Sequence, residues 1–111
     1  MRKFLWMGLG VLIAACQDSS PGTELPTCPP TIGIEGLAYS PSSCKMGVGQ
    51  RVSISASTAH PLRGLGTGNP IPATPTTATQ SYTFSKAGTY EYECSAHSAQ
   101  GMKGSITVVG P

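Results

Sequence analysis

Apolar and polar residues alternate along several short segments of the chain. In RVSIS (51–55), Val52 and Ile54 fall on one face, and the residues between them fall on the other. The same period of two runs through residues 81–84, 89–94 and 105–109. A period of two is typical of strands with one buried face. These segments are therefore predicted to be half-buried antiparallel strands, and no stretch shows a convincing helical period.

The segments between these strands supply the remaining elements. Residues 31–40 are expected to form one earlier strand, and Ser85–Thr89 a hairpin between the strands on either side. Residues 60–80, interrupted by Pro and Gly, are predicted to be a loop or an interrupted edge strand. With 14 Gly and 10 Pro in 111 residues, the composition favours short strands and turns over a helical bundle. We expect one all-β domain, a β-sandwich of about six to eight short strands.

The strand TYEYEC also predicts which side chains face the core. Tyr90, Tyr92 and Cys94 share one face, and Glu91 and Glu93 alternate with them. Acidic residues on the outer face of a strand are usually solvated. Both glutamates are therefore expected to lie in solvent.

The N-terminal segment is predicted to be a targeting signal. Arg2 and Lys3 precede a 12-residue apolar run, Phe4–Ala15, which is short for a membrane span and fits the hydrophobic region of a secretory signal. The run ends in IAAC. This ending resembles a bacterial lipobox, in which the cysteine, here Cys16, becomes the lipidated first residue. The alternative is an ordinary signal peptide cut near Ala15.

On this interpretation the chain has three parts: a lipoprotein signal peptide (1–15), a lipidated flexible tether (16–27) and a folded domain (28–111). We expect a protein outside the cytoplasm, anchored by lipid to a bacterial membrane in the periplasm or at the cell surface. Without the signal the chain keeps five basic and five acidic residues and no basic cluster. A nucleic-acid partner is therefore not expected.

The four cysteines have different predicted roles. Cys28 and Cys44 are separated by 16 positions with no histidine between them, and disulfides persist in exported proteins. A disulfide is the simplest interpretation, worth about 3 kcal/mol in the chain-entropy model; a second metal site is the alternative. With Cys16 lipidated, Cys94 is left unpaired.

Cys94 lies in a short segment that is rich in metal-ligand types. His97 and Met102 follow it in a loop before the last strand, and His60, the other histidine, comes just after the strand at 51–57. A thiolate, two imidazoles and a thioether are the donors of a type 1 copper site. Zinc would accept Cys and His, but a Met ligand argues against it. A Cys–His nucleophile pair would need an oxyanion hole and an orienting group that nothing in the sequence marks, so we expect no enzyme.

The segment GTYEYECSAHSAQGMKGSITVV, with its Cys-x2-His-x4-Met spacing, resembles the cupredoxins, especially plastocyanin and pseudoazurin. The likeness extends upstream through YSPSSCKMGVGQRVSISASTAH. It implies a Greek-key β-sandwich that binds one copper ion. By this resemblance His60, Cys94 and His97 are equatorial ligands and Met102 is the axial ligand. A dinuclear site would need a second cysteine in the loop, where position 98 is Ser.

One residue departs from the family pattern. Many cupredoxins have Asn after the first histidine, and the backbone N–H of that Asn donates to the copper thiolate. This chain has Pro61, which has no N–H. Ala96 stands where plastocyanin-like loops often have Pro, so it can offer an N–H. We therefore expect a more electron-rich thiolate, which favours Cu(II) and lowers the reduction potential.

The resemblance implies one-electron transfer by copper cycling between Cu(I) and Cu(II), with redox proteins such as a cytochrome or a terminal oxidase as partners. We expect a monomer with a small docking face formed by Pro61, Leu62, Ala99 and Gly101. A copper-binding or delivery protein with the same ligands is the alternative function. A structural surface lipoprotein with a vestigial site is a third.

Overall fold

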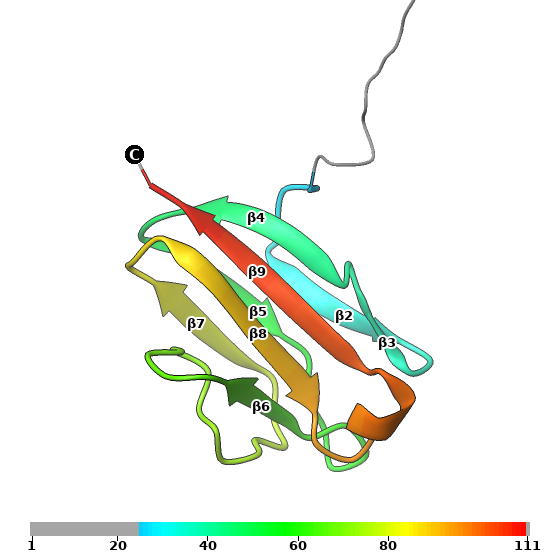
Figure 1. The fold of residues 1–111 in the computed structure, drawn as a ribbon. Helices are drawn as coiled ribbons and strands as arrows, with labels where there is room; N and C mark the ends of the chain where they lie inside the picture. The colour runs from blue at the N-terminus through cyan, green and yellow to red at the C-terminus, as the bar shows by residue number, and fades with distance from the viewer. Residues whose placement is uncertain (1–24, 111) are drawn as a thin grey trace, which may run out of the picture.

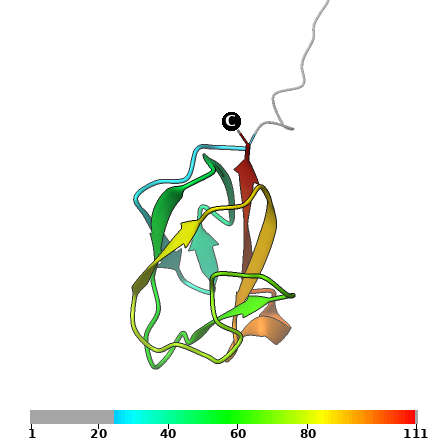
Figure 2. The ribbon, with the colours of Figure 1, turned by 90° about the vertical axis from the view of Figure 1, so that its left-hand side faces the viewer.

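A computed structural model describes residues 25–110. The expected signal peptide, Cys16 and most of the tether lie outside these residues. Within them, eight strands form two four-stranded sheets that pack face to face (Figures 1 and 2). In one sheet the order is β3 (Ala38–Ser40), β2 (Thr31–Glu35), β5 (Gln50–Ile54) and β7 (Gln80–Phe84). In the other it is β4 (Ser43–Gly47), β9 (Lys103–Val109), β8 (Gly88–Cys94) and β6 (Leu62–Leu65).

The predicted all-β sandwich is confirmed, but its pairing differs from the prediction. Both sheets are mixed, because β2 pairs parallel with β5 and β4 pairs parallel with β9. The segments predicted to be antiparallel do pair in that way, β5 with β7 and β8 with β9, but β5 and β9 each have a parallel neighbour as well. Alternation identifies the buried face of a strand and carries no information about which strand lies beside it.

The connection Ser85–Thr89 is a second case in which the sequence pattern did not reveal which strands are neighbours. It was expected to form a hairpin, yet β7 pairs with β5 whereas β8 pairs with β6 and β9. The chain therefore crosses from one sheet to the other at this point. Residues 31–40, expected to be one strand, instead form the antiparallel pair β2 and β3 around Gly36, which has a φ of 63°. The predicted interrupted edge strand within residues 60–80 is present as β6.

The core lies between the two sheets and is made by the inward side chains of every strand. Tyr92, Phe84, Ile32, Ile54, Leu62, Ile106 and Val52 are all at most 1% exposed. Tyr92 is the largest fully buried side chain of residues 25–110, and its ring lies edge-on to Tyr39 at a centroid distance of 4.9 Å. Burial raises the pKa of the Tyr92 phenol above its ordinary value. The side of the core next to Cys94 is thus buried and aromatic.

A disulfide between Cys28 and Cys44 joins the N-terminal segment to β4, as predicted. The same segment covers the outer edge of β4, since the Cys28 N–H donates to the Lys45 carbonyl and the Lys45 N–H donates to the Pro26 carbonyl. Covering an edge strand blocks pairing with other chains. Figure 1 shows this segment at the end of the sandwich away from the Ser98–Gln100 turn.

A short 3₁₀ turn at Ser98–Gln100 is the one helical element of the described residues. Within residues 25–110 there is no helix with the length and apolar character that crossing a membrane requires.

We predict that Gly104→Ala destabilises the domain by about 1–3 kcal/mol. Gly104 lies opposite Tyr92 in the ladder, and a Cβ there would lie 2.4 Å from the tyrosine ring. Gly33→Ala is the matched control, because its Cβ would have no neighbour within 4 Å. Chemical denaturation of both variants measures the difference. Equal stability of the two variants would contradict the close packing of Tyr92 on Gly104.

Candidate metal centre

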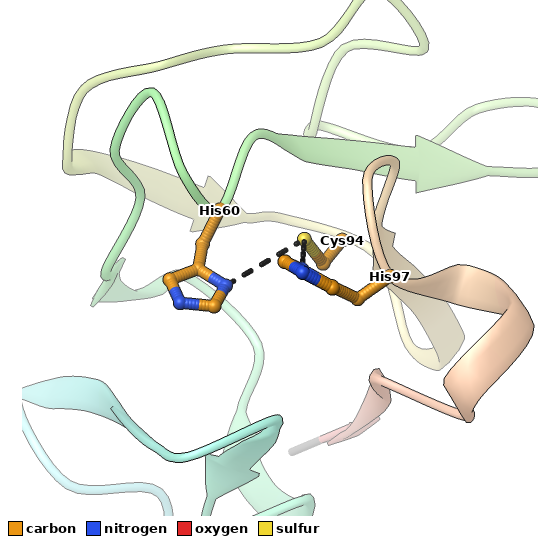
Figure 3. Close-up of side chains that lie close together, drawn as sticks. All are labelled: His60, Cys94 and His97. Carbon is orange, nitrogen blue, oxygen red and sulfur yellow. Dashed lines mark hydrogen bonds between the residues drawn. The ribbon is translucent and has the colours of Figure 1, made fainter.

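Three of the four predicted ligands meet at one end of the sandwich. Figure 3 shows His60, Cys94 and His97 with their donor atoms facing one another. The Cys94 sulfur lies 3.9 Å from Nδ1 of His60 and 3.4 Å from Nδ1 of His97. One donor atom from each of the three residues lies within 4.8 Å of the others.

A tight turn between β5 and β6 positions His60. The His60 N–H donates to the carbonyl and the hydroxyl of Ser57, and the Ser57 N–H donates back to the His60 carbonyl. This reciprocal bonding holds the turn closed. Sequence reasoning missed Ser57, although serine is a common turn residue and its place three residues before the histidine is the signal that could have found it.

Cys94 ends β8 with its side chain on the inward face, where it is fully buried. It has no disulfide partner, so its thiol is free. Burial first, and then the charge of Cys94, raise the pKa of the nearby Tyr39 phenol above its ordinary value. The thiol therefore lies at the edge of a low-dielectric core, where its interactions with a cation are strong.

The loop from Cys94 to Met102 closes on itself through backbone hydrogen bonds. The Cys94 N–H donates to the Met102 carbonyl at 2.9 Å, and the His97 N–H donates to the Cys94 carbonyl at 3.1 Å. The His97 carbonyl accepts in turn from Met102 at 3.3 Å. Gly101 ends the short turn between His97 and Met102 with a φ of 82°, a left-handed conformation that glycine adopts readily. The three loop residues predicted as ligands are thus held by one hydrogen-bonded frame.

Met102 follows this turn in the sequence, directly before β9, and its side chain is fully buried. Its backbone bonds to both Cys94 and His97 fix its position in the loop. Its thioether as the fourth, axial ligand remains a prediction.

Backbone contacts also join the two segments that carry the ligands. The Pro61 carbonyl accepts a hydrogen bond from the Ser95 N–H at 2.9 Å. One residue further, Leu62 of β6 lies opposite Cys94 of β8. Pro61 has no backbone N–H to donate, but its carbonyl fastens the His60 segment to the Cys94 segment. The sequence could not reveal Ser95, because any residue other than proline supplies that donor.

Two expectations from the sequence are wrong. Glu93 was expected in solvent but is only 6% exposed, because Arg63 of β6 lies directly opposite and donates to its Oε2 atom from Nε at 2.8 Å. Leu62 was expected on a docking face but is fully buried, since it faces inward in the sheet. Glu91 is exposed, as expected.

The donor set fits a single copper ion. Metal bonds of about 2.3 Å to sulfur and 2.0 Å to nitrogen, at trigonal angles, place the two donors about 3.7 Å apart. The two sulfur–nitrogen distances, 3.9 and 3.4 Å, lie on either side of that value. His60, Cys94 and His97 would hold the ion in this arrangement. An imidazole–thiolate plane of this kind suits copper in both oxidation states.

A comparison with protein families links the C-terminal part of the chain to copper-binding proteins. Residues 72–109 match the family described as copper binding proteins of the plastocyanin/azurin family. These residues include Cys94, His97 and Met102, whereas His60 lies upstream of them. Among proteins of curated function, none matches this chain by sequence.

Several solved structures share the fold. Oxidised plastocyanin from the fern Dryopteris crassirhizoma is 20% identical, with a TM-score of 0.58 over 71% of this chain and 99% of that one. A reduced amicyanin mutant is 23% identical, with a TM-score of 0.55 over 71% of this chain and 80% of that one. The protein therefore has the cupredoxin fold. Its C-terminal part carries the sequence pattern of the plastocyanin/azurin copper proteins.

Proposed function

We propose that the protein is an electron carrier with one type 1 copper ion, exported and held at a bacterial membrane by lipid on Cys16. The observation that carries the proposal is the convergence of His60, Cys94 and His97, which brings two nitrogens within 3.9 Å of one thiol sulfur. Copper bound there would supply one-electron chemistry by cycling between Cu(I) and Cu(II). Met102 would complete the site as a weak axial ligand.

The protein contributes a rigid frame for these ligands. Cys94 is fixed in the sheet, His97 in the hydrogen-bonded loop and His60 in its closed turn. Since these supports belong to a packed sandwich, the donors should move little when an electron is gained or lost. Little movement means a low reorganisation cost, which favours rapid transfer.

Electrons would enter and leave at the end of the sandwich that carries the site. His97 is partly exposed there, and the small residues Ala99 and Gly101 beside it are exposed. Pro61 is partly exposed next to His60. A face of this kind suits brief encounters with redox proteins such as a cytochrome or a terminal oxidase. In this role the protein works as a monomer and is not an enzyme.

A copper-delivery protein could use the same ligands. The closed ligand loop and the buried thiol favour the electron carrier, because delivery requires ligands that open readily to an acceptor. The two functions differ in the rate of copper transfer to a chelating acceptor, which should be slow for an electron carrier.

We predict that one equivalent of Cu(II) turns the protein intensely blue and that a reductant bleaches the colour reversibly. The colour reports a copper–thiolate bond, so Cys94→Ser should abolish it. Ser98→Ala, in the same loop without a predicted ligand role, is the control and should stay blue. Visible absorption during redox cycling is the measurement, and a colourless wild-type protein would overturn the proposal.

We predict that Pro61→Asn and Pro61→Ala both raise the reduction potential, by roughly 40 mV if the restored N–H contributes a hydrogen bond of about 1 kcal/mol to the thiolate. Such a bond draws electron density from sulfur and so favours Cu(I). Pro72→Asn, at an exposed position outside the site, is the control. Voltammetry at an electrode measures the shift. An unchanged or lower potential in both Pro61 variants would contradict this account of the departure from the family.

A further inference from the structure

Glu93 is the one charged residue buried among residues 25–110. A carboxylate withdrawn from water is costly unless it is paired and hydrogen-bonded. Arg63 supplies that pairing with two nitrogens, Nε at 2.8 Å and an Nη at 2.5 Å, both directed at the Oε2 atom of Glu93. The proposed electron transfer makes no direct use of either residue, so the burial of Glu93 calls for another explanation.

The position of this pair connects it to the metal centre. Arg63 comes three residues after His60, and Glu93 immediately precedes Cys94. The two residues are cross-strand partners in the β6–β8 ladder, next to the pair formed by Leu62 and Cys94. The ion pair therefore joins the two segments that hold the ligands, at the rung beside the buried thiol.

The site depends on this junction because His60 is the one predicted ligand outside the Cys94–Met102 loop. Its segment continues into β6, an edge strand of only four residues. A strand this short has few ladder hydrogen bonds to define its alignment. Asn69 fastens the far end, donating to the carbonyls of Leu65 and Glu91. Arg63 and Glu93 fasten the end nearest His60.

We propose that Arg63 and Glu93 are positioning residues that hold His60 in register with Cys94. Two donors on one buried carboxylate oxygen resist sliding of β6 along β8, since any shift would leave the charge unpaired. The pair acts from the outer face of the sheet and touches no ligand atom. Its effect on copper rests on the proposed function, whereas its effect on the β6–β8 alignment does not.

The test compares Glu93→Gln with Glu91→Gln, which removes the same charge from an exposed position on the same strand face. The first readout needs no metal. Exchange of the Ser95 amide, whose hydrogen bond to Pro61 spans the junction, should quicken at least about tenfold in Glu93→Gln. The Ser55 amide, which is hydrogen-bonded to Ile32 in the other sheet, is the internal reference, and its exchange rate should change much less. In Glu91→Gln the exchange rates of both amides should also change little.

The second readout uses copper. Release of Cu(II) to a chelator should be roughly 10-fold faster in Glu93→Gln, as expected for loss of an outer support to a metal ligand. Its visible spectrum should shift relative to both the wild type and Glu91→Gln. Arg63→Lys keeps the charge but loses the two-nitrogen contact, so its copper release rate should lie between those of the wild type and Glu93→Gln. This variant replaces Glu93→Gln in the test if Glu93→Gln does not fold.

The proposal would be overturned if Glu93→Gln were less stable but kept the wild-type Ser95 exchange relative to Ser55, the wild-type rate of Cu(II) release and the wild-type spectrum. Arg63 and Glu93 would then be an ordinary structural ion pair. A wild-type protein that binds no copper, with faster Ser95 exchange in Glu93→Gln, would reject the proposed function and support the positioning role.

Discussion

The pairing of β6 with the end of β8 is the contact on which the site depends. Cys94, His97 and Met102 belong to one loop, so local hydrogen bonding can hold them together. His60 comes from another part of the chain, 34 residues before Cys94, and it reaches the sulfur only because the segment after it becomes an edge strand. The Pro61–Ser95 hydrogen bond, the Leu62–Cys94 pair and the Arg63–Glu93 ion pair make that junction. Without it, only the predicted ligands of the loop would stay together.

The rest of the sandwich makes this junction stiff. Tyr92, two residues before Cys94, packs between the sheets against Tyr39 and leaves no room for a side chain at position 104. Close packing of this kind resists small displacements of the strand that carries the thiol. The disulfide and the covered edge of β4 secure the end from which the N-terminal segment departs (Figure 1). The sandwich is thus fastened at the end away from the ligands, whereas Ala99 and Gly101 at the other end are exposed.

Two residues next to predicted ligands, Pro61 and Glu93, connect the two segments that carry the ligands. Pro61 cannot donate to the thiolate, yet its carbonyl still joins the ligand segments. Glu93 places a buried charge on the outer face of the sheet, in the residue before Cys94, and this charge is paired with Arg63. In both cases a residue next to a ligand contacts the other ligand-bearing segment. Outer contacts of this kind orient ligands and tune a metal centre.

The sequence alone determined the fold class, the candidate ligands and the disulfide pair. Alternation depends only on local geometry, and the Cys–His–Met spacing lies within one loop, so both can be read along the chain. Tertiary structure decided which strands are neighbours, because the same alternation is compatible with a hairpin or a crossing between sheets, as residues 85–89 show. It also decided the burial of Glu93 and Leu62, which depends on what lies opposite them in β6 and β8. Tertiary structure likewise decided the approach of His60 to Cys94, because this long-range contact forms only when the strands between the two residues are correctly paired.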